Sequence, residues 1–167
     1  MTVLKQNKTA MNVSFQIMAL DAAQFAPYLS MDKANLIRHK AKWLTADAEP
    51  GFPCRVSLQD ANVDERVLLL TFNHHDVASP YRSSGPIYIR QHATTTIQAT
   101  NQVPKMLRHR QMSLRAYDQY GMMLAADVVS GKELEQGINK LFQQTAIVYI
   151  HIHNAGPGCF NCQVVRA

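Results

Sequence analysis

The sequence has no long apolar run, few cysteines and few charged residues, and each shortage excludes a class of protein. No apolar run approaches the length of a membrane-spanning helix. Three cysteines are a small and odd number, which argues against a disulfide-stapled secreted domain and favours a reducing compartment. With 47% hydrophobic and 17% charged residues, the composition is that of a soluble globular protein.

Short motifs that identify common enzyme and nucleic-acid-binding classes are also missing. The sequence contains no GxGxxG, no Walker loop, no HExxH and no GxSxG. It has neither a helix-turn-helix signature nor an aromatic RNA-binding strand motif. The net charge of +5 gathers in 38–42 and 105–110, but basic runs this short are typical of solvated helix faces. The sequence therefore does not favour nucleic-acid binding.

The N-terminal stretch lacks the continuous apolar centre of a signal peptide. We therefore expect a cytoplasmic protein without a membrane anchor. Residues 1–11 are predicted to form a flexible tail. Residues 12–167 are predicted to form a single domain, because that length is sufficient for one hydrophobic core.

Hydrophobic periodicity predicts an α+β fold with about seven strands and about three helices. The helices are expected from Asp32 to about Leu44, from Pro104 to about Arg110, and from Lys132 to about Gln143. Strands are expected at 12–20, 54–58, 66–72, 87–90, 112–117, 122–128, 147–153 and 159–165. Short turns between neighbours favour a largely antiparallel, twisted sheet that could be partly closed.

The last strand pair concentrates reactive side chains: His151, His153, Cys159 and Cys162 fall within twelve residues. Because side chains alternate along a strand, the two histidines share the polar face with Cys159, whereas Cys162 points to the core. A five-residue turn over 154–158 would place His153 opposite Cys159, close enough for direct contact.

This face has three interpretations. His151, His153 and Cys159 could ligate a metal ion and leave the open position of a catalytic site. Alternatively, Cys159 could be a nucleophile paired with His153, with His151 nearby and either Asn154 or Asn161 orienting the ring. In the third interpretation, the histidines are polar residues on a half-solvated sheet face and the cysteines are small hydrophobic residues.

Further polar residues could bind a ligand beside this face. The 80–86 loop offers hydroxyls, an arginine and backbone amides, which suit an oxyanion. Arg115 is expected on one strand face with Tyr117. The candidate ligand-binding residues are Arg82, Ser83, Ser84, Arg115, Tyr117, Asn154, Arg55 and Cys54. His74 and His75 are predicted to be exposed, because adjacent histidines rarely face one site.

Nine segments, taken in order along the chain, carry a resemblance to a known family: 50–58, 60–61, 66–70, 80–87, 113–118, 121–123, 126–129, 151–155 and 158–160. Together they resemble a bacterial family known as domain of unknown function 1203. The resemblance covers nearly all of the chain after the N-terminal tail. It implies a stand-alone bacterial cytoplasmic domain and brings no established activity, cofactor or catalytic residue.

The leading hypothesis is a protein that binds a small polar or anionic molecule on an Arg/His/Tyr sheet face and could act on it. The first alternative is a Cys/His-dependent hydrolase or transferase, or a metal-dependent enzyme. The second is an interaction module with weak nucleic-acid binding through 105–110. The sequence leaves the cofactor and the oligomeric state open.

Overall fold

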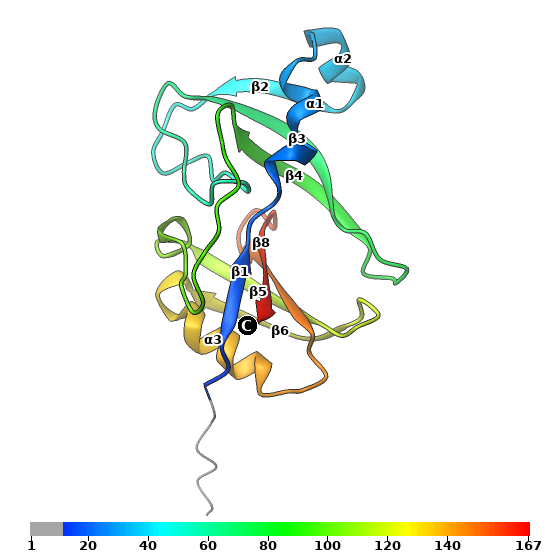
Figure 1. The fold of residues 1–167 in the computed structure, drawn as a ribbon, viewed down its shortest axis with the longest axis vertical. Helices are drawn as coiled ribbons and strands as arrows, with labels where there is room; N and C mark the ends of the chain where they lie inside the picture. Colours follow the sequence, from blue (N-terminus) through cyan, green and yellow to red (C-terminus); the bar gives the residue numbers. More distant parts are fainter. Residues whose placement is uncertain (1–11) are drawn as a thin grey trace, which may run out of the picture.

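The structure, a computed structural model, describes residues 12–167, so the predicted tail lies outside the described residues. Its strands form two open antiparallel sheets (Figure 1). The strands are β1 (Phe15–Met18), β2 (Ala41–Thr45), β3 (Arg66–His75), β4 (Ser83–Arg90), β5 (Gln111–Tyr117), β6 (Met123–Ser130), β7 (Tyr149–Asn154) and β8 (Phe160–Arg166). The α+β class is confirmed, but these eight strands make two sheets, and neither sheet is closed.

The larger sheet has the order β1-β8-β7-β5-β6, and the smaller has the order β2-β3-β4. The helices are short: α1 (Ala26–Leu29), α2 (Lys33–Arg38), α3 (Leu134–Phe142) and the 3-10 turns η1 (Ala22–Gln24), η2 (Lys105–Leu107) and η3 (Gly131–Glu133). None of the helices within 12–167 is long and apolar enough to cross a bilayer.

Two hydrophobic cores correspond to the two sheets. The first lies between the five-stranded sheet and α3, where Leu114 and Ile138 are fully buried. Gly137 allows this close packing, because a Cβ atom there would lie 2.8 Å from a methyl group of Leu114. The second core joins the three-stranded sheet to α2 through Leu36 and Leu68. The single domain expected over 12–167 stays a prediction.

The helix predicted from Asp32 to Leu44 is too long. Asp32 does cap α2, accepting a hydrogen bond from the Asn35 backbone N–H at 2.8 Å. However, the helix ends at Arg38, and Lys40 has a left-handed φ of 53° that turns the chain. The following residues form β2, whose Trp43 pairs with Leu68 of β3.

Two other predicted elements also differ. Residues 54–58 form turns with an isolated bridge between Cys54 and Tyr88 rather than a strand. The helix expected from Pro104 shrinks to η2. By contrast, β3 and β4 extend into both ends of the predicted 73–86 loop and cover half of it, so the two histidines of that loop lie on β3. The hairpin of β5 with β6 is confirmed.

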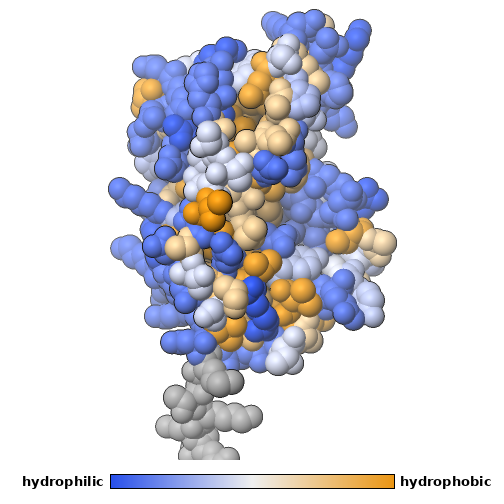
Figure 2. Space-filling model, viewed as in Figure 1, coloured by the Kyte–Doolittle hydropathy of each residue, from blue (hydrophilic) through white to orange (hydrophobic). Residues whose placement is uncertain are grey.

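Figure 2 shows that apolar residues on one face of the molecule form several small groups between polar ones. Such scattered exposure is ordinary for globular proteins.

Candidate functional site

Three histidines from the two sheets meet in one place, which we call the histidine cluster. His74 comes from β3 of the small sheet, and His151 and His153 come from β7 of the large sheet. One ring nitrogen from each lies within 4.8 Å of the other two. His151 and His153 are 1% and 0% exposed, and His74 is partly exposed. The cluster is therefore buried on the β7 side and accessible beside His74.

Each histidine of this cluster has one ring nitrogen without a hydrogen-bond partner. His74 Nδ1, His151 Nδ1 and His153 Nε2 are all buried and unpaired. Buried polar atoms are nearly always paired, so three unpaired atoms in one cluster require an explanation. The other ring nitrogen of His153, Nδ1, lies 2.9 Å from the Gly158 carbonyl oxygen and must donate to it. This hydrogen bond fixes the tautomer that leaves a lone pair on Nε2, as in metal-binding histidines.

Burial keeps the cluster uncharged. It lowers the pKa of His74 to about 4 and the pKa values of His151 and His153 to about 3. Neighbouring positive charges contribute in the same direction, while the Gly158 carbonyl opposes the shift at His153. Three neutral imidazoles with free lone pairs are therefore present near neutral pH, and this is the state that metal ligation requires.

The last two strands pair in a register other than the predicted one, and they contain a β-bulge. Ile152 pairs with Cys162, but His153 pairs with Phe160, so the register shifts by one residue between them. Phe160 rather than Cys159 therefore lies opposite His153, while Cys162 is buried in the core as expected. The bulge is a local insertion that redirects side chains, and alternation alone could not reveal it.

Phe160 forms an apolar wall of the cluster. Its ring stacks on the His74 ring, with centroids 5.1 Å apart and planes 1° from parallel. It also meets the ring of His151 edge-on at 5.0 Å. These contacts hold His74 against the large sheet and exclude water from the two buried histidines.

His75 has a different role from His74. The prediction that both are exposed is wrong, since His75 is 2% exposed. Its Nδ1 lies 2.8 Å from the Tyr81 carbonyl oxygen, and its Nε2 lies 2.9 Å from the Tyr149 hydroxyl. Both of its ring nitrogens are engaged, so His75 has no free ligand atom. A register irregularity between Phe72 and His75 accompanies the approach of both histidines to the large sheet.

Arg115 lies beside the cluster on β5. It pairs directly with His151 across the strands, and its charge contributes to the lowered pKa values of His74 and His153. Burial raises the pKa of the neighbouring Tyr117, and a hydrogen bond from Arg115 opposes that shift. Among residues 12–167, no carboxylate lies within 4 Å of the Arg115 guanidinium.

The remaining candidate ligand residues are not all at this site. Arg82 pairs with Asp76 at 2.7 Å, and both side chains are 63% exposed. Ser83 and Ser84 begin β4 on the same partly exposed segment. The Cys54 sulfur is buried in the second core, where it accepts backbone N–H bonds. Of the predicted ligand-binding set, Arg115 and Tyr117 lie beside the histidine cluster, and the charge of Arg55 also acts on His153.

Cys159 lies next to Arg55. Arg55 is 1% exposed and donates from Nε to the Phe160 carbonyl oxygen at 2.7 Å and from Nη1 to the Pro53 carbonyl oxygen. Burial lowers the pKa of its guanidinium, while a hydrogen bond with Cys159 opposes that shift. Asn154 Nδ2 also approaches the Cys159 sulfur, at 3.8 Å. Arg55 and Cys159 line a cavity of about 500 Å³.

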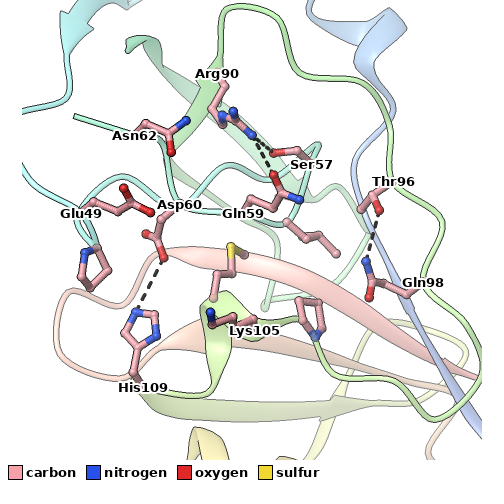
Figure 3. A pocket seen from close by; sticks show the side chains of 14 residues that line it. Glu49, Ser57, Gln59, Asp60, Asn62, Arg90, Thr96, Gln98, Lys105 and His109 are labelled. Atoms are coloured by element: carbon pink, nitrogen blue, oxygen red, sulfur yellow. Dashed lines mark hydrogen bonds and ion pairs between the residues drawn. The ribbon is translucent and has the colours of Figure 1, made fainter. Parts of the chain in front are cut away.

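A larger cavity of about 720 Å³ contains none of the cluster histidines (Figure 3). Its Arg90 bonds to Glu65 at 2.7 Å and to Gln59 at 3.0 Å, and its Asp60 binds Arg110. These charged groups already have partners, whereas the cluster nitrogens do not. The histidine cluster is therefore the stronger candidate despite the greater size of this cavity.

The basic 105–110 run is largely neutralised by neighbouring acids. Arg108 forms an ion pair with Glu135, and Arg110 forms one with Asp60. The charge that suggested an anionic macromolecular partner is therefore mostly engaged within the protein.

Comparison with known proteins gives a family but no annotated relative. A family model described as "Protein of unknown function (DUF1203)" matches residues 51–166, more than half of the chain. The matched region includes the histidine cluster, Phe160, Arg115 and Cys159. No curated protein and no solved structure matches the chain.

Proposed function

We propose that this chain, which belongs to the DUF1203 family, binds one divalent transition-metal ion through His74, His151 and His153. A small polar molecule would bind at the position that these ligands leave open, and the metal ion would act on it. The observation that carries this proposal is the convergence of three neutral imidazoles, two of them fully buried, each with one buried ring nitrogen that has no hydrogen-bond partner.

The chemistry of the donors supports this proposal. Imidazole nitrogens suit zinc, iron, copper and nickel ions, and the hard ions calcium and magnesium prefer oxygen. Three protein ligands with a fourth position for water or substrate are typical of catalytic zinc sites. Structural zinc sites usually have four protein ligands, and the cluster has three within the described residues. A metal ion held this way lowers the pKa of its bound water and polarises carbonyl or phosphoryl oxygens.

Neighbouring groups would orient the ligands. The Gly158 carbonyl fixes the tautomer of His153, and the Gln163 side chain hydrogen-bonds His151. Such partners of the ligands typically contribute about 10- to 100-fold in metal affinity. The partly exposed edge of His74 supplies an entry path. In this arrangement His74 replaces Cys159 in the ligand set expected from the sequence.

Metal titration tests the proposal. Protein stripped with a chelator should bind one Co²⁺ per chain and develop the visible d–d bands of four- or five-coordinate cobalt. Single alanine substitutions of His74, His151 or His153 should weaken binding by at least about 100-fold, since each removes a ligand. His92→Ala, which removes an exposed histidine outside the cluster, should bind normally. Stoichiometric binding that survives in folded cluster variants would contradict the proposal.

A second candidate function is thiol chemistry at Cys159, as a hydrolase or transferase. The observation that favours it is the buried Arg55, which has no carboxylate within 4 Å among residues 12–167 and hydrogen-bonds Cys159. A buried cation is stabilised by a neighbouring anion, which a thiolate could supply. Asn154 would hold the sulfur in place, and the adjacent cavity would admit a substrate.

Iodoacetamide labelling of the native protein tests this second candidate. The Cys159 sulfur should displace iodide and form a thioether, while Cys54 and Cys162 serve as buried internal controls. Burial raises the pKa of Cys162 to about 12, so its thiol should stay unreactive. Peptide mass spectrometry would locate the label. Equal labelling of all three cysteines, or labelling only after unfolding, would show that Cys159 is not a selectively reactive thiol.

A further inference from the structure

The surroundings of the proposed metal ion carry an excess of positive charge. The three ligands are neutral, so the ion would keep its full charge of about +2. Arg115 adds a positive charge beside His151. No acidic side chain lies within 4 Å of Arg115 in the described part of the chain to balance it. A ligand that completes this site must therefore bring negative charge.

Strand register places Arg115 correctly for such a ligand. Ser113, Arg115 and Tyr117 of β5 pair in order with His153, His151 and Tyr149 of β7. The Cβ atoms of directly paired residues lie about 4.5–5.5 Å apart, and their side chains share one face of the sheet. The Arg115 guanidinium and a metal ion on His151 would therefore lie side by side.

The contacts of Arg115 leave donors for a ligand. Its side chain hydrogen-bonds the Tyr117 phenol. Arginine presents five N–H donors in a planar fork, so one hydrogen bond to a phenol does not saturate it. Arg115 is partly buried, and a charge-assisted hydrogen bond there is stronger than one in open solvent.

We infer that the ligand of this site is a small oxyanion, a carboxylate or a phosphate, with one oxygen on the metal ion and another on the Arg115 guanidinium. This inference rests on the proposed metal site. A neutral polar molecule would leave the charge of Arg115 uncompensated, and the planar fork matches two oxygens of one anion. Of the other two arginines considered from the sequence, Arg82 is mostly exposed and already paired with Asp76, and Arg55 donates to the carbonyl oxygens of Phe160 and Pro53.

The test uses the Co²⁺-loaded protein, titrated separately with acetate and inorganic phosphate at constant ionic strength. An oxyanion that enters the coordination sphere should shift the cobalt d–d bands. Arg115→Gln should lower the affinity for that anion by about 10- to 100-fold, the usual cost of losing a charged hydrogen bond. Arg115→Lys should restore part of the affinity, because it keeps the charge without the fork. Arg82→Gln is the matched control and should titrate like the wild type.

The outcomes separate the two proposals. If the wild-type protein develops no cobalt bands, the metal site itself is wrong. A different pair of results would overturn the oxyanion inference alone, provided that cobalt binds equally to the wild type and to Arg115→Gln. In the first, neither anion shifts the cobalt bands. In the second, the two proteins bind the anion with the same affinity. A shift with acetate only identifies a carboxylate ligand. A shift with phosphate only identifies a phosphate, and either result supports the inference.

Discussion

The metal-free protein should be less stable at about pH 5 than at pH 7 by about 4 kcal/mol through His151 and His153 alone. Burial lowers the pKa of each to about 3 in the folded state, against 6.5 for an ordinary histidine. Between pH 7 and pH 5 the unfolded chain binds protons that the folded chain does not, so the free energy of unfolding decreases as the pH decreases. The stability is fully present above about pH 6.5 and is lost as the pH drops toward 3.

Urea unfolding at several pH values measures this loss. Each histidine contributes about 2 kcal/mol at pH 5, so His151→Gln and His153→Gln should each reduce the loss by that amount. His92→Gln should not change it, because that side chain is exposed. Saturating metal should raise stability near neutral pH, and protons should compete with the metal below it. A pH profile identical in the wild type and both cluster variants would show that these histidines are not buried neutral.

Replacing Phe160 with alanine should have the second large effect, on both stability and metal affinity. The ring is 2% exposed, and removing a buried phenylalanine costs about 3–5 kcal/mol. Beyond stability, the substitution removes the surface on which His74 stacks and opens the buried histidines to water. We expect the affinity for Co²⁺ to fall by about 10- to 100-fold, as for other residues that orient a metal ligand.

Two control variants separate the stacking contribution from general destabilisation. Phe142→Ala removes a ring of similar burial from the α3 core, so it should cost similar stability and leave metal affinity unchanged. Phe160→Leu should retain much of the stability and lose the stacking. Metal affinity measured by titration and stability measured by thermal melting should therefore diverge between these variants. If affinity follows stability in all three, Phe160 has no specific role at the site.

Local patterns predicted much of the large sheet. The β5–β6 hairpin and α3 were predicted because alternation and amphipathic spacing are properties of neighbouring residues. Alternation also predicted that His151 shares a face with His153 and that Arg115 shares one with Tyr117, and the pairing of β5 with β7 joins these two faces. The burial of Cys162 also followed from strand parity, because the bulge lies on the other side of its pairing with Ile152.

The third member of the cluster could not be predicted in this way. His74 reaches the site through the packing of two sheets, and its ligand partners lie on a strand far away in the sequence. The available signal was the apolar run of 66–72, which continues into β3 as far as His75. The position of Phe160 depended on a bulge, and the end of α2 depended on a left-handed Lys40. Both are single-residue events that leave the hydrophobic period unchanged.

The placement of the cluster has a mechanical consequence, since His74 belongs to one sheet and its partners to the other. A bound ion would act as a reversible cross-link between two halves that otherwise meet through side-chain contacts such as His75 with Tyr149, 74 residues apart. Loading the ion would then restrict relative movement of the sheets, and releasing it would restore that movement. The occupancy of one small site would in this way strengthen the contact between the two sheets.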